Sequence, residues 1–146
     1  MDNLRQIQII QKAMEGELKL LRGELAKLND RIQRKQANIR KISDYQKEYA
    51  ESDKLNTSRE TPLLHTNLYS FSKKIMAIVA LEEIELNRLI SQREILLQKM
   101  TKVDLKIKIM QHFENRVLKK VVSLQDKAEE RQHDDLAVIN QPRDET

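Results

Sequence analysis

The chain has 146 residues, of which 34% are charged and 3% aromatic, with two glycines, two prolines and no cysteine. Without cysteine, neither disulfides nor thiol catalysis is available. The 27 basic and 23 acidic residues, with a net charge of +4, are interleaved, a pattern more typical of solvated helices than of a one-sided nucleic-acid footprint. We therefore expect long helices and no nucleic-acid partner.

The sequence also argues against insertion into a membrane. The longest apolar run, Ile75–Leu81, is far shorter than the ~20 residues that span a bilayer. The segment Leu4–Ile10 is interrupted by polar residues, so no signal peptide is visible. The sequence predicts a protein that is soluble or at most peripheral.

The first predicted element is a helix over about residues 3–56. Apolar residues recur there with the 3-4 spacing of a coiled coil, in one heptad frame that begins at Leu4. The predicted a positions are Leu4, Gln11, Leu18, Leu25, Ile32, Ile39 and Gln46, and the predicted d positions are Ile7, Met14, Leu21, Leu28, Lys35, Ile42 and Tyr49.

A polar break then predicts a turn at 57–61 and a second helix over about 62–135. Thr61 can cap this helix, and Pro62 suits its first position. Its first predicted contact residues are Leu64, Leu68, Phe71, Ile75 and Ile78. The spacing through Glu82 and Leu86 then indicates a stutter, and the 3-4 spacing resumes from Leu86 to Ala128. We expect residues 136–146 to form a disordered tail.

Two helices joined by a short turn predict a single domain, an all-α antiparallel coiled-coil hairpin. If the turn centres near residue 59, the numbers of facing residues add to about 118. Lys35 then faces Glu82, which gives either a pair that fixes the register or two solvated groups at the edge of the interface.

The same register gathers the aromatic residues near the turn. Tyr49 is expected to meet Tyr69, and Tyr45 to lie near Phe71. These rings either hold the turn together or serve as contact anchors. Tyr45 lies at heptad position g, beside the interface, so we expect its ring to be partly exposed.

The second predicted helix is longer than the first, so residues 116–135 lack a partner within the chain. An apolar stripe nevertheless continues there. It comprises Val117, Leu118, Val121, Val122, Leu124 and Ala128. Apolar surface of this kind is seldom left in water, so we expect another copy or a different protein to cover it.

No catalytic or metal-binding pattern is present, and we expect neither enzyme activity nor a cofactor. His65, His112 and His133 are too far apart for a metal site. Gly16 and Gly23 lie at outward f positions. Either they are tolerated there without a function, or they form a smooth stripe that lets a partner approach closely. The basic stretch from Lys99 to Lys120 is typical of a solvated face; the alternative is contact with an acidic surface or phosphate.

Several short stretches resemble the flagellar FliJ family, the small cytoplasmic stalk proteins of the type III export apparatus. "ISDYQKEYAES" at 42–52 resembles the family's tyrosine segment near the end of its first helix. "NLYSF" at 67–71, "KVDL" at 102–105 and "LQD" at 124–126 are also similar. The length and the two-helix layout agree over essentially the whole chain.

This resemblance implies a coiled coil similar to the central stalk of F-type ATPases. The end that carries both termini would insert into a hexameric export ATPase and promote its assembly. The turn end would contact the cytoplasmic domain of the membrane export gate, and some family members also bind export chaperones. The location implied is cytoplasmic, peripheral at the cytoplasmic face of the inner membrane.

The resemblance and the apolar pattern together assign residues to both contacts. The gate-binding residues would be Tyr45, Tyr49 and Phe71, with Ile42, Ile75 and Ile78 as less specific matches. The ring-binding residues would be Val117, Leu118, Val121, Leu124 and Ala128, with Leu4 and Ile7. Two alternatives are a self-assembling structural coiled coil and the equivalent stalk of a virulence type III secretion system.

Overall fold

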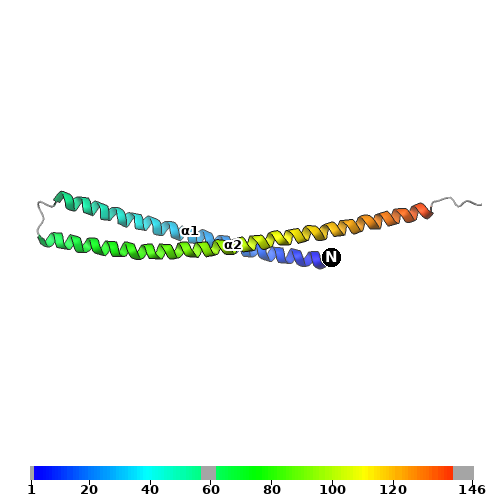
Figure 1. Cartoon of the computed structure of the whole chain (residues 1–146), viewed down its shortest axis with the longest axis horizontal. Helices are drawn as coiled ribbons and strands as arrows, with labels where there is room; N and C mark the ends of the chain where they lie inside the picture. The colour runs from blue at the N-terminus through cyan, green and yellow to red at the C-terminus, as the bar shows by residue number, and fades with distance from the viewer. Residues whose placement is uncertain (1, 57–61, 140–146) are drawn as a thin grey trace, which may run out of the picture. The chain divides into compact units, whose positions relative to one another are not determined.

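The chain forms an all-helical antiparallel hairpin in a computed structural model. Helix α1 runs from Asp2 to Asn56 and α2 from Pro62 to Ile139, and these residues, which the structure describes, contain no strand (Figure 1). Side chains are described for residues 3–51 and 66–138. The predicted fold class is confirmed.

The helix boundaries differ from the prediction mainly at the end of α2. This helix begins at Pro62 as predicted but continues to Ile139. The first residues of the predicted tail are therefore helical, because Leu136 and Ala137 are good helix formers that follow without a break. The predicted turn at 57–61 and the rest of the tail, 140–146, lie outside the described residues.

The hairpin divides into two compact units. The terminal unit combines Met1–Lys19 with Thr101–Thr146, and the turn unit comprises Leu20–Met100. Within each unit, α1 and α2 lie side by side (Figure 1). Each unit has its own line of contact between the helices.

In the turn unit, the heptad frame of α1 is confirmed with one exception. Ile32 is buried, and the other predicted a and d positions from Leu21 to Gln46 are half-buried. Tyr49 is the exception, because 47% of its surface is exposed. Tyr49 therefore lies at the margin of the contact with α2 rather than within it.

The predicted stutter in α2 is wrong. The residues that face α1 keep a 3-4 spacing throughout the unit: Leu68, Ser72, Ile75, Val79, Glu82, Leu86, Leu89, Arg93, Leu96 and Met100. Phe71 and Ile78, predicted to face α1, are 44% and 50% exposed. In a coiled coil, the 3-4 spacing determines which residues face the partner helix. The small Ser72 therefore occupies a facing position, while the larger Phe71 lies beside it.

The contacts between the helices correct the predicted register. Lys35 pairs with Glu82, Tyr49 contacts Phe71, and Asn29 contacts Arg93. Their residue numbers add to 117, 120 and 122. A sum of 121 places every facing residue of α1 opposite one of α2, for example Ile32 opposite Leu89. Lys35 thus reaches Glu82 diagonally, so the predicted pair forms although the sum of 118, which assumed a turn centred near residue 59, is too small.

In the terminal unit, the same spacing continues and then ends. Leu18, Val103 and Ile107 are buried, and Gln11 donates a 2.8 Å hydrogen bond to Glu114. The half-buried residues on α2 continue through Val117 to Val121, whereas every described side chain from 122 to 138 is exposed. α2 thus extends past the first residues of α1, but the uncovered part begins after residue 121 rather than at 116.

Candidate protein-binding surfaces

Four aromatic side chains of the turn unit form an exposed group, which we call the aromatic surface. Tyr45 and Tyr69 are 62% and 60% exposed, and Tyr49 and Phe71 are 47% and 44% exposed. The expected exposure of Tyr45 is confirmed. α1 contributes two of these rings and α2 the other two, because antiparallel packing brings the end of α1 beside the start of α2.

The pairing of these rings differs from the prediction. Tyr49 contacts Phe71 rather than Tyr69, with ring centroids 5.3 Å apart and an angle of 56° between the ring planes. Tyr69 instead lies under the Lys73 ammonium, whose nitrogen is 4.7 Å from the ring centroid. Contacts of this kind stabilise by about 0.5–1.5 kcal/mol each. The rings are therefore positioned but remain accessible.

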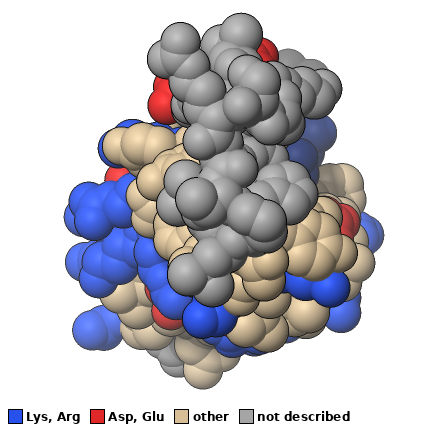
Figure 2. Space-filling view, turned by 90° about the vertical axis from the view of Figure 1, so that its left-hand side faces the viewer, with Lys and Arg blue, Asp and Glu red and all other residues tan. Residues whose placement is uncertain are grey.

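A small groove adjoins the aromatic surface. It is lined by Gln46, Tyr49, Ala50, Leu68, Tyr69, Phe71, Ser72 and Ile75. Figure 2 views the molecule from the side of the turn, where residues other than Lys, Arg, Asp and Glu are seen beside Lys and Arg side chains. A partner here would meet the rings of Tyr49, Tyr69 and Phe71 and a lining without charged residues.

The less specific candidates near the aromatic surface take different positions. Ile42 and Ile75 are half-buried between the helices. Ile78 is exposed, and its neighbours Met76 and Leu81 are 56% and 66% exposed. Sequence reasoning overlooked Met76 and Leu81 because neither falls at a facing position. Their apolar side chains at outward positions were the signal that could have identified them.

A second surface lies on α2 in the terminal unit, and we call it the overhang surface: Val117, Leu118, Val121, Val122, Leu124 and Ala128. Leu118, Val122 and Leu124 are 41%, 54% and 67% exposed. Val117 and Val121 are half-buried, as are Leu4 and Ile7. The overhang surface therefore begins where α1 still lies beside α2 and continues, from Val122 onward, along a part of α2 whose described side chains are all exposed.

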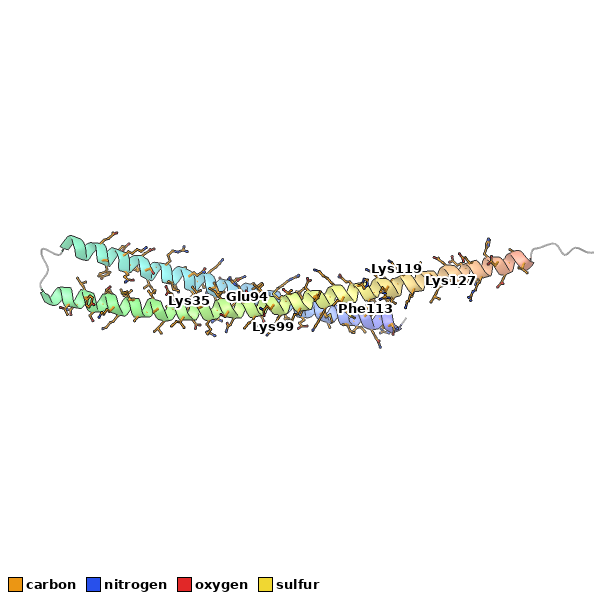
Figure 3. All side chains as sticks on the ribbon, viewed as in Figure 1. Lys35, Glu94, Lys99, Phe113, Lys119 and Lys127 are labelled. Carbon is orange, nitrogen blue, oxygen red and sulfur yellow. The ribbon has the colours of Figure 1, made fainter. Side chains whose placement is uncertain are left out.

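Charged residues of both signs lie along the overhang surface. Lys119 and Lys127 project from this part of the helix (Figure 3). A shallow hollow on the same stretch includes Leu118, Val122 and Asp126, and a second includes Glu129 and Glu130. Leu136 and Val138, which are 57% and 69% exposed, extend the apolar character further than predicted.

Polar side chains interrupt the contact between the helices at defined positions. In the turn unit, Lys35 Nζ lies 2.9 Å from Glu82 Oε2, and the two side chains are only 24% and 30% exposed. The two groups are thus a half-buried pair rather than two solvated ones. Such a pair favours one register over its neighbours.

A further ion pair lies on the surface of the turn unit. Arg88 Nε donates a 2.9 Å hydrogen bond to Glu85 Oε2. This bond lowers the pKa of the Glu85 carboxyl and raises the pKa of the Arg88 guanidinium. The pair is exposed, so it contributes more to local orientation than to stability.

The described residues contain neither a metal cluster nor a membrane span. Residues 2–56 and 62–139 include no helix that is apolar over a sufficient length to cross a bilayer. Within the described part of the chain, no three His, Asp or Glu residues converge as metal ligands.

Comparisons of this chain with sequence models of known protein families, with curated protein sequences and with solved structures find no match.

Proposed function

We propose that the chain is a coiled-coil stalk of a flagellar type III export apparatus, of the FliJ type. The overhang surface carries this proposal. Leu118 is exposed beside the start of α1, and Val122 and Leu124 are exposed where α2 continues beyond it. Burial of such side chains is worth about 1.5–3 kcal/mol each, which favours a partner that surrounds the helix.

The partner proposed for the overhang surface is a hexameric export ATPase. A ring with a central opening can contact a helix from several sides, which suits a helix that lacks a partner of its own. Leu4 and Ile7, at the start of α1, would lie at the margin of this contact. In this role the chain promotes assembly of the ring.

The partner proposed for the aromatic surface is the cytoplasmic domain of an export gate protein. Tyr45 is the most exposed of the four rings, and exposed tyrosines commonly anchor protein contacts. Tyr49 and Phe71 contact each other and would present Tyr45 by fixing the ends of the two helices. Ile42, Ile75 and Ile78 would support this surface from between the helices and beside them.

On this proposal, the chain works by binding and has no catalytic activity or cofactor of its own. It would be cytoplasmic and would associate with the cytoplasmic face of the inner membrane only through its partners, which include export chaperones as further candidates. The equivalent stalk of a virulence secretion system would use the same surfaces. The tyrosine segment at 42–52 favours the flagellar system.

The ring contact can be tested with a triple variant of the overhang surface. Leu118→Gln, Val122→Gln and Leu124→Gln together remove apolar surface while they retain a good helix former. A matched control carries Leu20→Gln, Leu81→Gln and Ile84→Gln, which are 72%, 66% and 66% exposed elsewhere.

The measurement is hexamerisation and turnover of the cognate ATPase at micromolar concentrations of the chain. We expect the native chain and the control to increase hexamerisation, and the overhang variant to lose most of this effect. An ATPase whose assembly does not respond to the native chain would contradict the proposal.

A self-assembling structural coiled coil is the second candidate, because a second copy could also cover the overhang surface. Sedimentation across a range of concentrations distinguishes the two candidates. A tight dimer that the overhang variant converts to a monomer favours self-assembly. A native chain that is monomeric or only weakly associated favours the stalk.

The gate contact has its own test. Tyr45→Ala with Tyr49→Ala should weaken binding to the gate's cytoplasmic domain and leave helicity unchanged. If binding persists while the helices of the turn unit melt earlier, the tyrosines have a structural role instead.

A further inference from the structure

The terminal unit contains an apolar groove that the overhang surface does not account for. It lies between α1 and α2 where both helices are present. Its apolar lining is Ile7, Ile10, Met110, Phe113 and Val117. Ile10 and Phe113 are 42% and 47% exposed, and Phe113 lies on α2 where the first turns of α1 run beside it (Figure 3).

Basic residues follow one edge of this groove. The facing residues of α2, from Val103 to Val117, define its heptad frame, and positions c and g lie on the side of the groove. Between 101 and 123, these positions are occupied by Lys102, Lys106, Ile109, Phe113, Arg116, Lys120 and Ser123. This edge therefore combines four exposed cations with two exposed apolar residues and has no acid.

The nearest acids of α2 already have partners away from this edge. Asp104 lies 3.1 Å from Lys108, and Glu114 accepts the hydrogen bond from Gln11 between the helices. On α1, Glu17 lies at a g position on the side of the groove, and among the described residues it forms no ion pair. The cations of the edge thus retain an excess of positive charge.

The spacing of these cations adds a second argument. Lys102 and Lys106 are four residues apart, and so are Arg116 and Lys120. Like charges at this spacing destabilise a helix by a few tenths of a kcal/mol per pair. A ligand with negative charge beside an apolar stripe would relieve this repulsion and would also cover Ile109 and Phe113.

We propose that this groove binds an amphipathic helix of a partner protein whose apolar stripe is flanked by Asp and Glu. We call the site the basic groove: Ile7, Ile10, Lys102, Lys106, Ile109, Met110, Phe113, Arg116, Val117 and Lys120. From Lys102 to Lys120 the edge extends about 27 Å at 1.5 Å per residue, which matches a bound helix of roughly 18 residues. The basic groove adjoins the overhang surface, with which it shares Val117, and its cations and Phe113 lie outside that surface. The inference goes beyond the proposed function.

Other occupants fit the basic groove less well. Nucleic acid would be held by the cations but would leave the apolar lining without a role. A membrane surface is flat, whereas Ile7 and Ile10 line a groove. The acidic stretch 126–135 of a second copy also contains Lys127 and Arg131. These two basic residues would be repelled by the cations of the edge.

The test uses the full chain and a fluorescein-labelled 20-residue helical peptide, with Leu at 3-4 spacing and Glu at the flanking positions. Its binding is measured by fluorescence anisotropy. One control peptide replaces each Glu by Lys, and another has the same composition in an order without an apolar stripe. We expect only the acidic amphipathic peptide to bind.

Two variants locate the site. Lys102→Glu with Lys106→Glu should weaken peptide binding about tenfold or more, because attraction becomes repulsion. Phe113→Gln should also weaken it about tenfold, because the apolar contact with the ring is lost. The matched control, Lys12→Glu with Lys19→Glu, makes the same change in net charge at exposed positions of α1 away from the groove and should have little effect.

Each outcome decides the proposal. Equal weakening by the control pair would show that only net charge matters and would overturn it, as would equal binding of the peptide without an apolar stripe. Binding to phosphatidylserine vesicles or duplex DNA but not to the acidic peptide would assign the cations to another ligand. Peptide binding lost in the Lys102/Lys106 and Phe113 variants, with unchanged circular dichroism, supports the basic groove whether or not a cognate ATPase responds to the chain.

Discussion

Replacement of the half-buried pair Lys35–Glu82 should separate its effect on stability from its effect on register. Removal of one partner, as in Lys35→Met, leaves the Glu82 carboxylate only 30% exposed and without its 2.9 Å contact. Exposed pairs contribute about 0–1 kcal/mol, and breaking a fully buried pair costs about 3–5 kcal/mol. For this intermediate exposure we expect a cost of about 1–2 kcal/mol.

The double variant Lys35→Met with Glu82→Leu should have the opposite effect. Both side chains lie largely out of water, so each apolar replacement gains about 1–2 kcal/mol of the 1.5–3 available at full burial. When the lost attraction between Lys35 and Glu82 is subtracted from this gain, the free energy of unfolding of the double variant should be about 1–2 kcal/mol higher than that of the native chain. Without the polar pair, we also expect its self-association to increase.

Urea unfolding followed by circular dichroism at 222 nm gives the four free energies of the cycle, and sedimentation gives the oligomeric state. The control is the exposed pair Asp30–Arg34, whose side chains are 56% and 77% exposed at 3.0 Å. Its coupling should be below about 0.5 kcal/mol. The reasoning is refuted if the double variant is less stable than the native chain while it remains monomeric, or if the two pairs show equal coupling.

Three further predictions follow from the described residues. Gly16→Ala and Gly23→Ala should each raise the free energy of unfolding by about 0.5–1 kcal/mol, because the added methyl group meets no atom within 4 Å; if partner binding falls while stability rises, the glycines form a functional stripe. Leu89→Ala should cost about 2–4 kcal/mol in urea unfolding, since Leu89 is only 1% exposed, and a loss below 1 kcal/mol would mean that the helices re-pack around it. The Glu85 pKa, measured by NMR titration, should lie below its ordinary value and return towards it in Arg88→Gln, because Arg88 bonds the ionised carboxylate; the pair's contribution is therefore present above the ordinary pKa and is lost as the pH falls through the lowered one.

The sequence was sufficient to predict the two helices and the frame of α1. Seven heptads in one phase leave little choice of which side of α1 faces its partner, and Leu18 and Ile32 are buried as that phase requires. The break before Pro62 likewise determined where α2 begins. These features depend on periodicity and local chemistry, which a sequence displays directly.

The frame of α2 near the turn could not be chosen on hydrophobicity alone. Phe71 and Ile78 are more apolar than their neighbours Ser72 and Val79, yet the latter face α1. The phase of a long coiled coil is set by all its layers of facing residues together. A small residue can therefore occupy a facing position while a larger apolar neighbour remains exposed. A strict 3-4 count backwards from Leu89 would have identified Ser72 and Val79.

The candidate sites were predictable where they depend on one helix and less so where they depend on the register between α1 and α2. The exposure of Tyr45 follows from its heptad position, and the overhang surface follows from unequal helix lengths. The contact of Tyr49 with Phe71 depends on the register, which differs from the predicted one by about one turn of the helix. The basic groove needed the frame of both helices, because its apolar lining and its cations alternate along the sequence.

The small number of fully buried residues suggests how binding and stability are coupled in this chain. In a two-helix hairpin, each facing side chain is covered from one side only, and the buried residues are confined to Leu18, Ile32, Leu89, Leu96, Val103 and Ile107 among the described ones. A partner that covers the overhang surface or the basic groove would bury apolar side chains that α1 and α2 leave partly exposed. Because a ligand that binds only the folded form stabilises it by mass action, occupancy of either surface should raise the melting temperature of the terminal unit. The surfaces that recruit partners would then also complete the core that the chain alone leaves half-covered.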